Sequence, residues 1–268
     1  MIANARMYAV TPEAEAAWQA LLGHIAAEAG VALDYVIYPA PQPLEDLWRR
    51  GDLGCVFMCG YPIALGIADV IPIAAPIPSA DWAAGRADYR SDLIVRADAP
   101  FVTLEDTFGG RTGWTVAHSH SGFNAWRHHL LGHRTTERPR LYREVRGDLV
   151  TARCILDEVL AGTIDVGPLD AYWHMLIRRY RPELLAGVRV LASTAVAPMP
   201  AFVASRGADR GMIERLRNSF VAAASRSWFA GAQCALLIDG FAAVDHASFA
   251  ETLRWDAEAK AADYLVPA

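Results

Sequence analysis

The feature that most constrains this chain is the alternation of strand-like and helix-like segments along most of its length. Leu53–Met58 is an unbroken apolar run, which is the pattern of a strand buried on both faces of a parallel sheet. Helix patterns flank such runs: one begins after Thr11, a plausible N-cap, and ends at Gly30. Strand–helix–strand alternation favours sheets covered by helices, so we predict an α/β fold with mostly parallel sheets.

The same reasoning gives the other elements. Further strands are expected at Arg6–Val10, Leu33–Tyr38, Asp92–Ala97, Arg111–Ala117, Ile164–Pro168, Val188–Ser193 and Ala201–Ala204. Further helices are expected at Leu44–Arg50, Leu149–Ala161, Asp170–Arg179, Ala208–Arg226 and Ala247–Tyr264. The last third of the chain is therefore predicted to be helical.

Composition narrows the function classes. The chain has 268 residues, is 53% hydrophobic and carries a net charge of −5, so a large core is expected and a general basic footprint for nucleic acid is missing. No apolar run is long enough to span a membrane. The N-terminal residues show no secretory signal pattern. We therefore expect a cytoplasmic protein as the sequence stands, or a periplasmic one if a leader precedes it.

Polar residues gather where predicted strands end, which is where α/β proteins bind ligands. The strand at Arg111–Ala117 is followed by a helix start made of Ser119, His120, Ser121 and Gly122. The N–H groups of a helix start lack intrahelical partners and lie at the positive end of the helix dipole. With two serine hydroxyls they predict an anion site that needs no lysine. The alternative is an ordinary serine N-cap.

Two other strand ends carry candidates. Gly60 and Tyr61 follow the Leu53–Met58 strand, where a glycine permits close approach of a ligand and a tyrosine offers a ring and a hydroxyl. A tight turn with a half-buried tyrosine is the alternative. Asp170 is either a helix N-cap or an acceptor for a ligand proton or amine. The candidate set is completed by two tyrosines beside strands and an arginine able to bind an anion: Tyr8, Tyr89 and Arg146.

The histidines do not form a metal pattern. Five of the 8 histidines lie between His118 and His133, but no H-E-x-x-H or C-x-x-C motif accompanies them. Neither a nucleotide-binding glycine motif nor a nucleophile elbow is present. We expect no metal and no cofactor.

Several segments, taken in order, resemble the phosphate/phosphite/phosphonate substrate-binding proteins of ABC transporters over roughly residues 5 to 230. The most specific match is Thr103 to Gly122, which is similar to the family's strand followed by Ser-Thr-Ser-Gly. The other matching segments are Asp52–Phe57, Tyr89–Val95, Leu160–Val166 and Val188–Val203.

The resemblance implies a type II periplasmic binding protein fold, in which two lobes joined by two crossover strands close on a ligand. Lobe one would comprise residues 1–92 and 195–268, and lobe two residues 93–194. Ser119, His120, Ser121 and the N–H of Gly122 would grip a phosphonate-like oxyanion, and Tyr61 would take the place of a family tyrosine. An ABC permease would be the partner, and no catalysis would be required.

Two departures keep other functions open. His120 stands where the family has a threonine, and the family's Ser-His-Asp segment is not matched, although Arg146-Gly147-Asp148 lies nearby. An enzyme of the same fold could use His120 and Asp170 as acid and base on a small acidic metabolite. A ligand sensor that passes closure to a partner protein is a third possibility.

Overall fold

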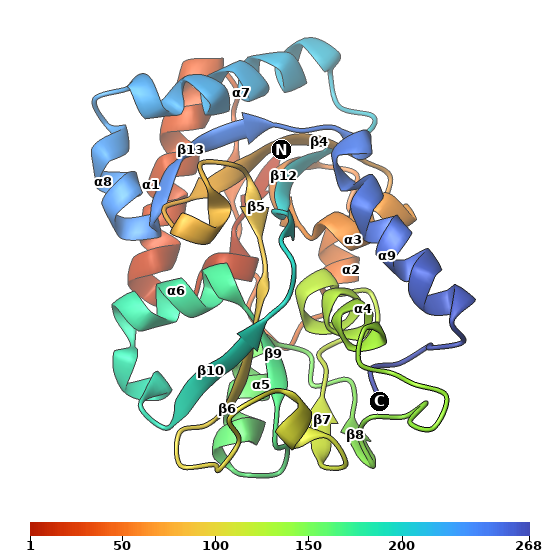
Figure 1. Cartoon of the computed structure of the whole chain (residues 1–268). Coiled ribbons are helices and arrows are strands. Elements are labelled where there is room, and N and C mark those ends of the chain that lie inside the picture. The colour runs from red at the N-terminus through yellow and green to blue at the C-terminus, as the bar shows by residue number, and fades with distance from the viewer. The chain divides into compact units, whose positions relative to one another are not determined.

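The computed structural model describes all 268 residues, and the chain divides into two compact α/β units (Figure 1). Unit 1 comprises Met1–Tyr89 and Pro198–Ala250, and unit 2 comprises Arg90–Ala197 and Glu251–Ala268. The short strands β5 (Asp88–Tyr89) and β11 (Ala197–Pro198) lie at two of the points where the chain passes from one unit to the other. Each unit is therefore assembled from segments that are far apart in the sequence.

Unit 1 is built on a six-stranded sheet with the order β13-β4-β12-β3-β1-β2. Its strands are β1 (Ile2–Asn4), β2 (Asp34–Tyr35), β3 (Leu53–Met58), β4 (Val70–Pro78), β12 (Ala201–Ser205) and β13 (Ile238–Ala243). All six residues of β3 are buried, as its unbroken apolar run predicts. The strand β12, which enters after the chain has passed through unit 2, lies between β3 and β4 and runs antiparallel to both.

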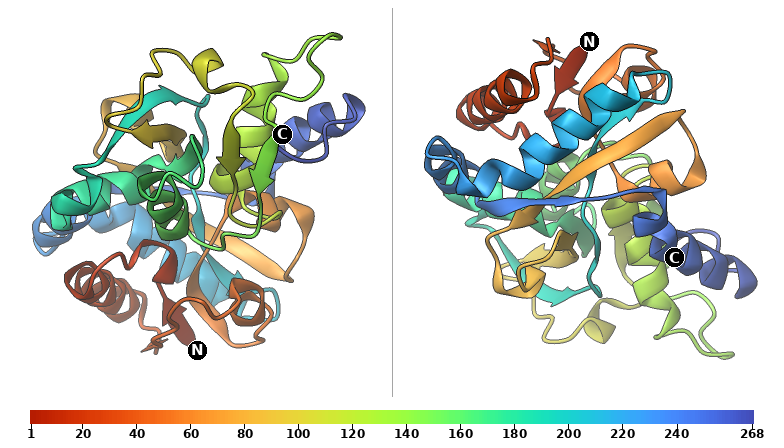
Figure 2. Two further views of the ribbon diagram at one scale, coloured as in Figure 1. Left: turned by 90° about the horizontal axis from the view of Figure 1, so that it is seen from below. Right: turned by 90° about the horizontal axis from the view of Figure 1, so that it is seen from above.

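The helices of unit 1 are α1 (Pro12–Ala29), α2 (Leu44–Trp48), α3 (Gly60–Leu65), α7 (Arg210–Ala222) and α8 (Phe229–Leu236). The hydroxyl of Thr11 caps α1 and Gly30 ends it in the left-handed region, as the sequence predicts. The helix α7 packs on α1 and lies across β4 and β13 (Figure 2). Aromatic rings fill the core between them: Phe57 and Phe202 stack with ring centroids 3.8 Å apart, and Trp18 meets Phe57 edge-on.

Unit 2 holds a three-stranded sheet with the order β10-β6-β9 and a two-stranded pair, β7 with β8. These strands are β6 (Ser91–Arg96), β7 (Arg111–Gly113), β8 (Glu144–Arg146), β9 (Gly167–Asp170) and β10 (Val188–Ser193). Its helices are the π-helical turn η4 (His120–Asn124), α4 (Ala125–Leu131), α5 (Ala152–Leu160), α6 (Ala171–Tyr180) and α9 (Ala250–Ala261). Here too the arriving strand, β6, lies between two antiparallel neighbours.

The predicted α/β fold is therefore confirmed, and its sheets are mixed: β1, β2 and β3 run parallel to one another, whereas β12 runs antiparallel to its neighbours. Strands β3 and β4 do run in the same direction, but β12 separates them. A strand that returns from the other unit enters the centre of the sheet from the opposite end, so it pairs antiparallel with the strands on either side. The alternation of patterns in the sequence predicts which segments are strands and which are helices. It does not predict that a strand from a remote part of the chain will insert between two others.

Two local predictions were wrong. The predicted strand Arg6–Val10 is a 3-10 turn at Arg6–Tyr8, because the side chain of Asn4 accepts a hydrogen bond from the Arg6 N–H at 3.0 Å and ends β1 early. The last third of the chain is not wholly helical, since β13 forms the edge of the unit 1 sheet. Its alternation is obscured by Gly240, which adopts a φ of 156°.

The C-terminal segment belongs to unit 2, which differs from the predicted lobe one of residues 195–268. Tyr264 and Ala268 share one apolar cluster with Trp126 and Leu130 of α4. The residues that follow α9 therefore have an apolar contact with α4 that the sequence pattern alone did not reveal.

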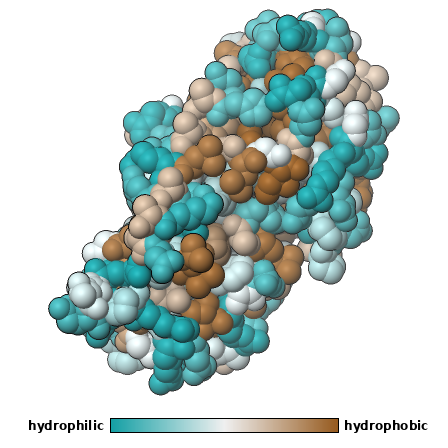
Figure 3. Space-filling view, turned by 90° about the vertical axis from the view of Figure 1, so that its right-hand side faces the viewer, coloured by the Kyte–Doolittle hydropathy of each residue, from teal (hydrophilic) through white to brown (hydrophobic).

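Figure 3 shows the face that carries α9. Hydrophilic side chains cover much of it, and apolar side chains gather in separate patches. Leu253, Leu265 and Val266 are among the exposed large apolar residues near the C-terminus. No helix is both long enough and apolar enough to cross a membrane.

Candidate functional site

The Ser119–Gly122 segment forms a capped helix start in unit 2. Ser119 precedes η4, and its hydroxyl accepts a hydrogen bond from the Gly122 N–H at 3.1 Å. The helix then continues without a break through η4 and α4 to Leu131. π-helical turns of this kind occur frequently at functional sites. The Gly122 N–H, predicted to grip the ligand, is thus used in the cap.

Close packing explains why residue 122 is a glycine. A Cβ atom at this position would lie 2.1 Å from Oγ1 of Thr115, a buried hydroxyl that has no hydrogen-bond partner of its own. The N–H of Thr115 also donates to the carbonyl of Gly122 at 3.2 Å. The helix start therefore sits directly against the chain that follows β7, and a larger residue would push it away.

Asp170 lies beside this helix start and is the N-cap of α6, the first of the two roles considered for it. Its Oδ1 caps α6 by accepting the N–H groups of Tyr172 and Trp173, each at 3.0 Å. Its Oδ2 is 3.5 Å from the Ser121 hydroxyl. The position is fixed by sheet register, since Ser91 on β6 pairs with Asp170 and donates its hydroxyl hydrogen to the Ser121 carbonyl at 2.8 Å.

His120 lies in the same turn, but its side chain is 1% exposed and stacks on Trp255, with ring centroids 5.2 Å apart. Its Nδ1 is 3.3 Å from the side-chain nitrogen of Asn124. Burial lowers the pKa of His120 to about 3, so the imidazole is neutral near pH 7. A histidine that cannot gain a proton at neutral pH is unsuited to the acid–base role of the enzyme hypothesis.

Arg146 has a partner elsewhere. It ends β8, is exposed, and forms an ion pair with Glu158 of α5. The carboxylate of Glu158 neutralises this guanidinium, so the contact that the structure shows for Arg146 is with α5 and not with the helix start.

The candidates in unit 1 gather around the end of β3. Gly60 begins α3, and a Cβ atom there would lie 2.5 Å from the ring of Phe249. Tyr61 is 4% exposed, and Tyr89 is 1% exposed with its hydroxyl 3.6 Å from the sulfur of Cys59. Tyr8 is equally buried and meets Phe57 edge-on. Most of each tyrosine therefore packs in the unit 1 core.

Sequence reasoning missed a buried polar cluster in unit 2. Asp92 accepts hydrogen bonds from His174 Nδ1 at 2.8 Å and from the Ser193 hydroxyl at 3.0 Å. Hydrogen bonds from His174 and Ser193 outweigh the effect of burial and lower the pKa of Asp92. These residues tie β6 to α6 and β10. Their separation of 82 and 101 positions from Asp92 left no local pattern to detect.

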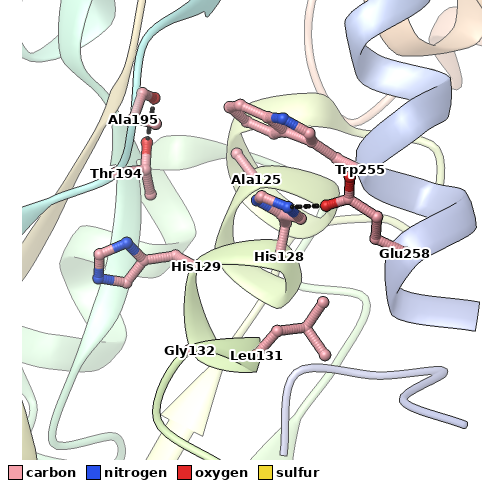
Figure 4. Close-up of a pocket in the computed structure, with 9 residues that line it drawn as sticks. All are labelled: Ala125, His128, His129, Leu131, Gly132, Thr194, Ala195, Trp255 and Glu258. Atoms are coloured by element: carbon pink, nitrogen blue, oxygen red, sulfur yellow. Dashed lines mark hydrogen bonds and ion pairs between the residues drawn. The ribbon is translucent and has the colours of Figure 1, made fainter. Parts of the chain in front are cut away.

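One pocket of unit 2, with a volume of about 390 Å³, opens beside α4 (Figure 4). Its lining residues are Ala125, His128, His129, Leu131, Gly132, Thr194, Ala195, Trp255 and Glu258. None of the predicted site residues lines it, so the pocket does not mark the predicted ligand site. No group of three or more histidine, cysteine, aspartate or glutamate side chains is placed to hold a metal ion.

Comparison with known proteins identifies the family of this chain. Residues 9–249 match the family described as the periplasmic phosphonate substrate-binding protein of ABC transporters. The chain belongs to this family. None of the proteins with curated functions matches the sequence.

Solved structures support the fold. A binding protein component of an ABC phosphonate transporter from Pseudomonas aeruginosa has a TM-score of 0.77 and 15% identity, covering 98% of this chain and 87% of that one. PhnD1 from Prochlorococcus marinus, in complex with methylphosphonate, has a TM-score of 0.78 and 12% identity, covering 97% and 98%. A Xanthomonas citri protein bound to ATP has a TM-score of 0.67 and 19% identity, covering 98% of each chain. At such identities the likeness shows the fold alone.

Proposed function

We propose that this substrate-binding protein binds a small phosphonate-like or phosphate-like oxyanion at the Ser119–Gly122 turn. The observation that carries the proposal is the arrangement of the Ser121 hydroxyl, the first-turn N–H groups and the Asp170 carboxylate in one place. The N–H groups and the hydroxyl suit anionic oxygens, because they are neutral donors at the positive end of a helix.

Asp170 adds selectivity to this arrangement. A carboxylate is an acceptor only, so beside an oxyanion it requires a ligand oxygen that still carries a proton, or an ammonium group on the ligand. We therefore expect singly protonated phosphonates, phosphate or aminophosphonates to bind, and fully ionised sulfate to bind more weakly.

Family membership also suggests the partner. A substrate-binding protein of an importer delivers its ligand to an ABC permease outside the cytoplasmic membrane, and we propose the same task for this chain. Subcellular fractionation of cells that express the natural gene tests this part. Recovery in the cytoplasm alone would contradict it.

Calorimetric titration with methylphosphonate, phosphate and sulfate tests the site. Ser119→Ala removes the cap hydroxyl and should weaken phosphonate binding. Thr151→Ala is a matched control, because Thr151 caps α5 in the same unit by accepting the Cys154 N–H at 3.1 Å. Both variants should lose about 1 kcal/mol of stability, but only Ser119→Ala should lose affinity. Equal affinities in the two variants, or no binding by the wild type, would contradict the proposal.

A further inference from the structure

The C-terminal helix α9 covers one side of the helix start. Trp255 of α9 is 3% exposed and contacts two histidine rings. His120 stacks on it with ring centroids 5.2 Å apart, and His128 stacks on it at 4.6 Å with an interplanar angle of 3°. The indole N–H donates to Glu251 at 2.8 Å. Trp255 is therefore held in one orientation by three side chains.

Two further contacts with α9 hold the stacked rings of His120, Trp255 and His128 in place. His128 Nε2 is 2.7 Å from Glu258 of α9, and this contact is visible beside the indole in Figure 4. Asn124, the last residue of η4, donates to the Thr252 carbonyl of α9 at 2.8 Å. Two turns of α9 thus hold the helical segment whose first residue is His120.

We propose that Trp255 is a positioning residue for the oxyanion site: it fixes the His120 backbone at the helix start and keeps the imidazole out of water, so that the turn recognises its ligand with neutral donors only. The inference rests on the proposed function. If Trp255 acts in this way, the imidazole of His120 carries no charge beside the bound anion. The affinity for the anion then does not change between pH 5 and 8 through any titration of His120.

Titratable and charged groups surround His120 on three elements. They are His128 and Arg127 on α4, Glu251 and Asp256 on α9, and Asp170 at the end of β9, which packs against η4. His128 and Glu251 act on His120 in opposite directions, and desolvation is the largest influence on its pKa. Removing the indole would admit water and return the imidazole toward the ordinary histidine pKa of about 6.5.

The test is a titration of methylphosphonate into the wild type, Trp255→Ala and Trp255→Phe at pH 5.5, 6.5 and 8. The ratio of variant to wild-type dissociation constants cancels the titration of the ligand itself. At pH 8 we expect Trp255→Ala to bind on the order of tenfold more weakly, because the helix start is no longer held against α9. At pH 5.5 the ratio should fall several-fold, since the exposed His120 becomes a cation beside the anion. Trp255→Phe should restore a ratio near one at every pH.

Unit 1 offers a matched control. Trp228 is stacked on His24, with ring centroids 4.7 Å apart, and its indole N–H donates to Glu28 at 2.9 Å. Trp228→Ala removes the same kind of histidine-stacked, glutamate-bonded tryptophan away from the helix start. Its ratio should stay near one at all three pH values.

Three results would overturn the inference: a Trp255→Ala ratio that does not change with pH, a ratio equal to that of Trp228→Ala, or a wild-type His120 that titrates above pH 6 by NMR. The NMR measurement decides the question even if Trp255→Ala does not fold. Failure of the wild type to bind methylphosphonate and phosphate would instead refute the proposed function, because the pKa of His120 is measured without any ligand.

Discussion

Replacing Asp256 with alanine should strongly destabilise the protein, because it removes one partner of a buried ion pair. The side chains of Arg127 on α4 and Asp256 on α9 are 3% and 7% exposed and form a direct hydrogen bond. Arg127 also donates to the side chain of Asn124 at 3.0 Å and to the Leu265 carbonyl at 3.2 Å. The guanidinium therefore joins α4 to two parts of the C-terminal segment.

The magnitude follows from leaving this guanidinium buried without its carboxylate. Breaking a buried pair by removing one partner costs about 3–5 kcal/mol. For a protein of this size that corresponds to a fall in melting temperature of about 6–20 °C. Replacing both residues, as Arg127→Met with Asp256→Leu, should recover most of the loss, because no uncompensated charge then remains in the core.

Urea unfolding followed by circular dichroism measures the effect. The control is Asp157→Ala, which breaks the Arg153–Asp157 pair on α5, where the two side chains are 48% and 50% exposed. An exposed pair of this kind contributes under about 1 kcal/mol. If Asp256→Ala cost no more than Asp157→Ala, the view that a buried charge pair anchors α9 would be refuted.

Three further changes test other parts of the structure. Gly122→Ala should lower both the melting temperature and phosphonate affinity, because its Cβ would meet Thr115 Oγ1 at 2.1 Å; calorimetry should show binding weaker than in the wild type. As the pH is lowered from about 6.5, His120 alone should reduce the free energy of unfolding by about 1.4 kcal/mol per pH unit. The reason is that the unfolded chain gains a proton that the folded imidazole, with its pKa of about 3, does not. Urea unfolding measured from pH 7 to 4.5 should show a weaker dependence of stability on pH in His120→Gln. Thr11→Ala should cost about 1 kcal/mol in the same assay, because it removes the acceptor of the Ala14 N–H at the start of α1.

Sequence reasoning succeeded where a signal is local. The Leu53–Met58 strand, the cap at Thr11 and the helix start at Ser119 each depend on residues within one or two turns, and the structure has all three. The family resemblance that rested on the last of these was also confirmed. Strand–helix alternation thus predicted the fold class, and local polar spacing predicted the capped helix start.

Sequence reasoning failed where the signal is long-range. The antiparallel insertion of β12, the polar cluster around Asp92 and the assignment of α9 to unit 2 all depend on partners at least 80 positions apart. No periodicity or motif records such pairs, because the two partners lie in separate parts of the sequence and neither constrains the local pattern around the other. The one sign in the sequence that the helix start needs a distant partner was His120, a titratable residue in place of the family's threonine.

The substitution at His120 changes what the helix start needs from the rest of the chain. A threonine at that position is small and carries no charge at any pH, so it needs no cover. A histidine left in water would titrate near pH 6.5 and make the affinity for an anion depend on pH. Trp255 lies 135 positions later in the sequence, yet its ring covers this imidazole. The histidine and the tryptophan are therefore best understood as a pair, and a relative that keeps the threonine should tolerate loss of the tryptophan without acquiring a pH-dependent affinity ratio.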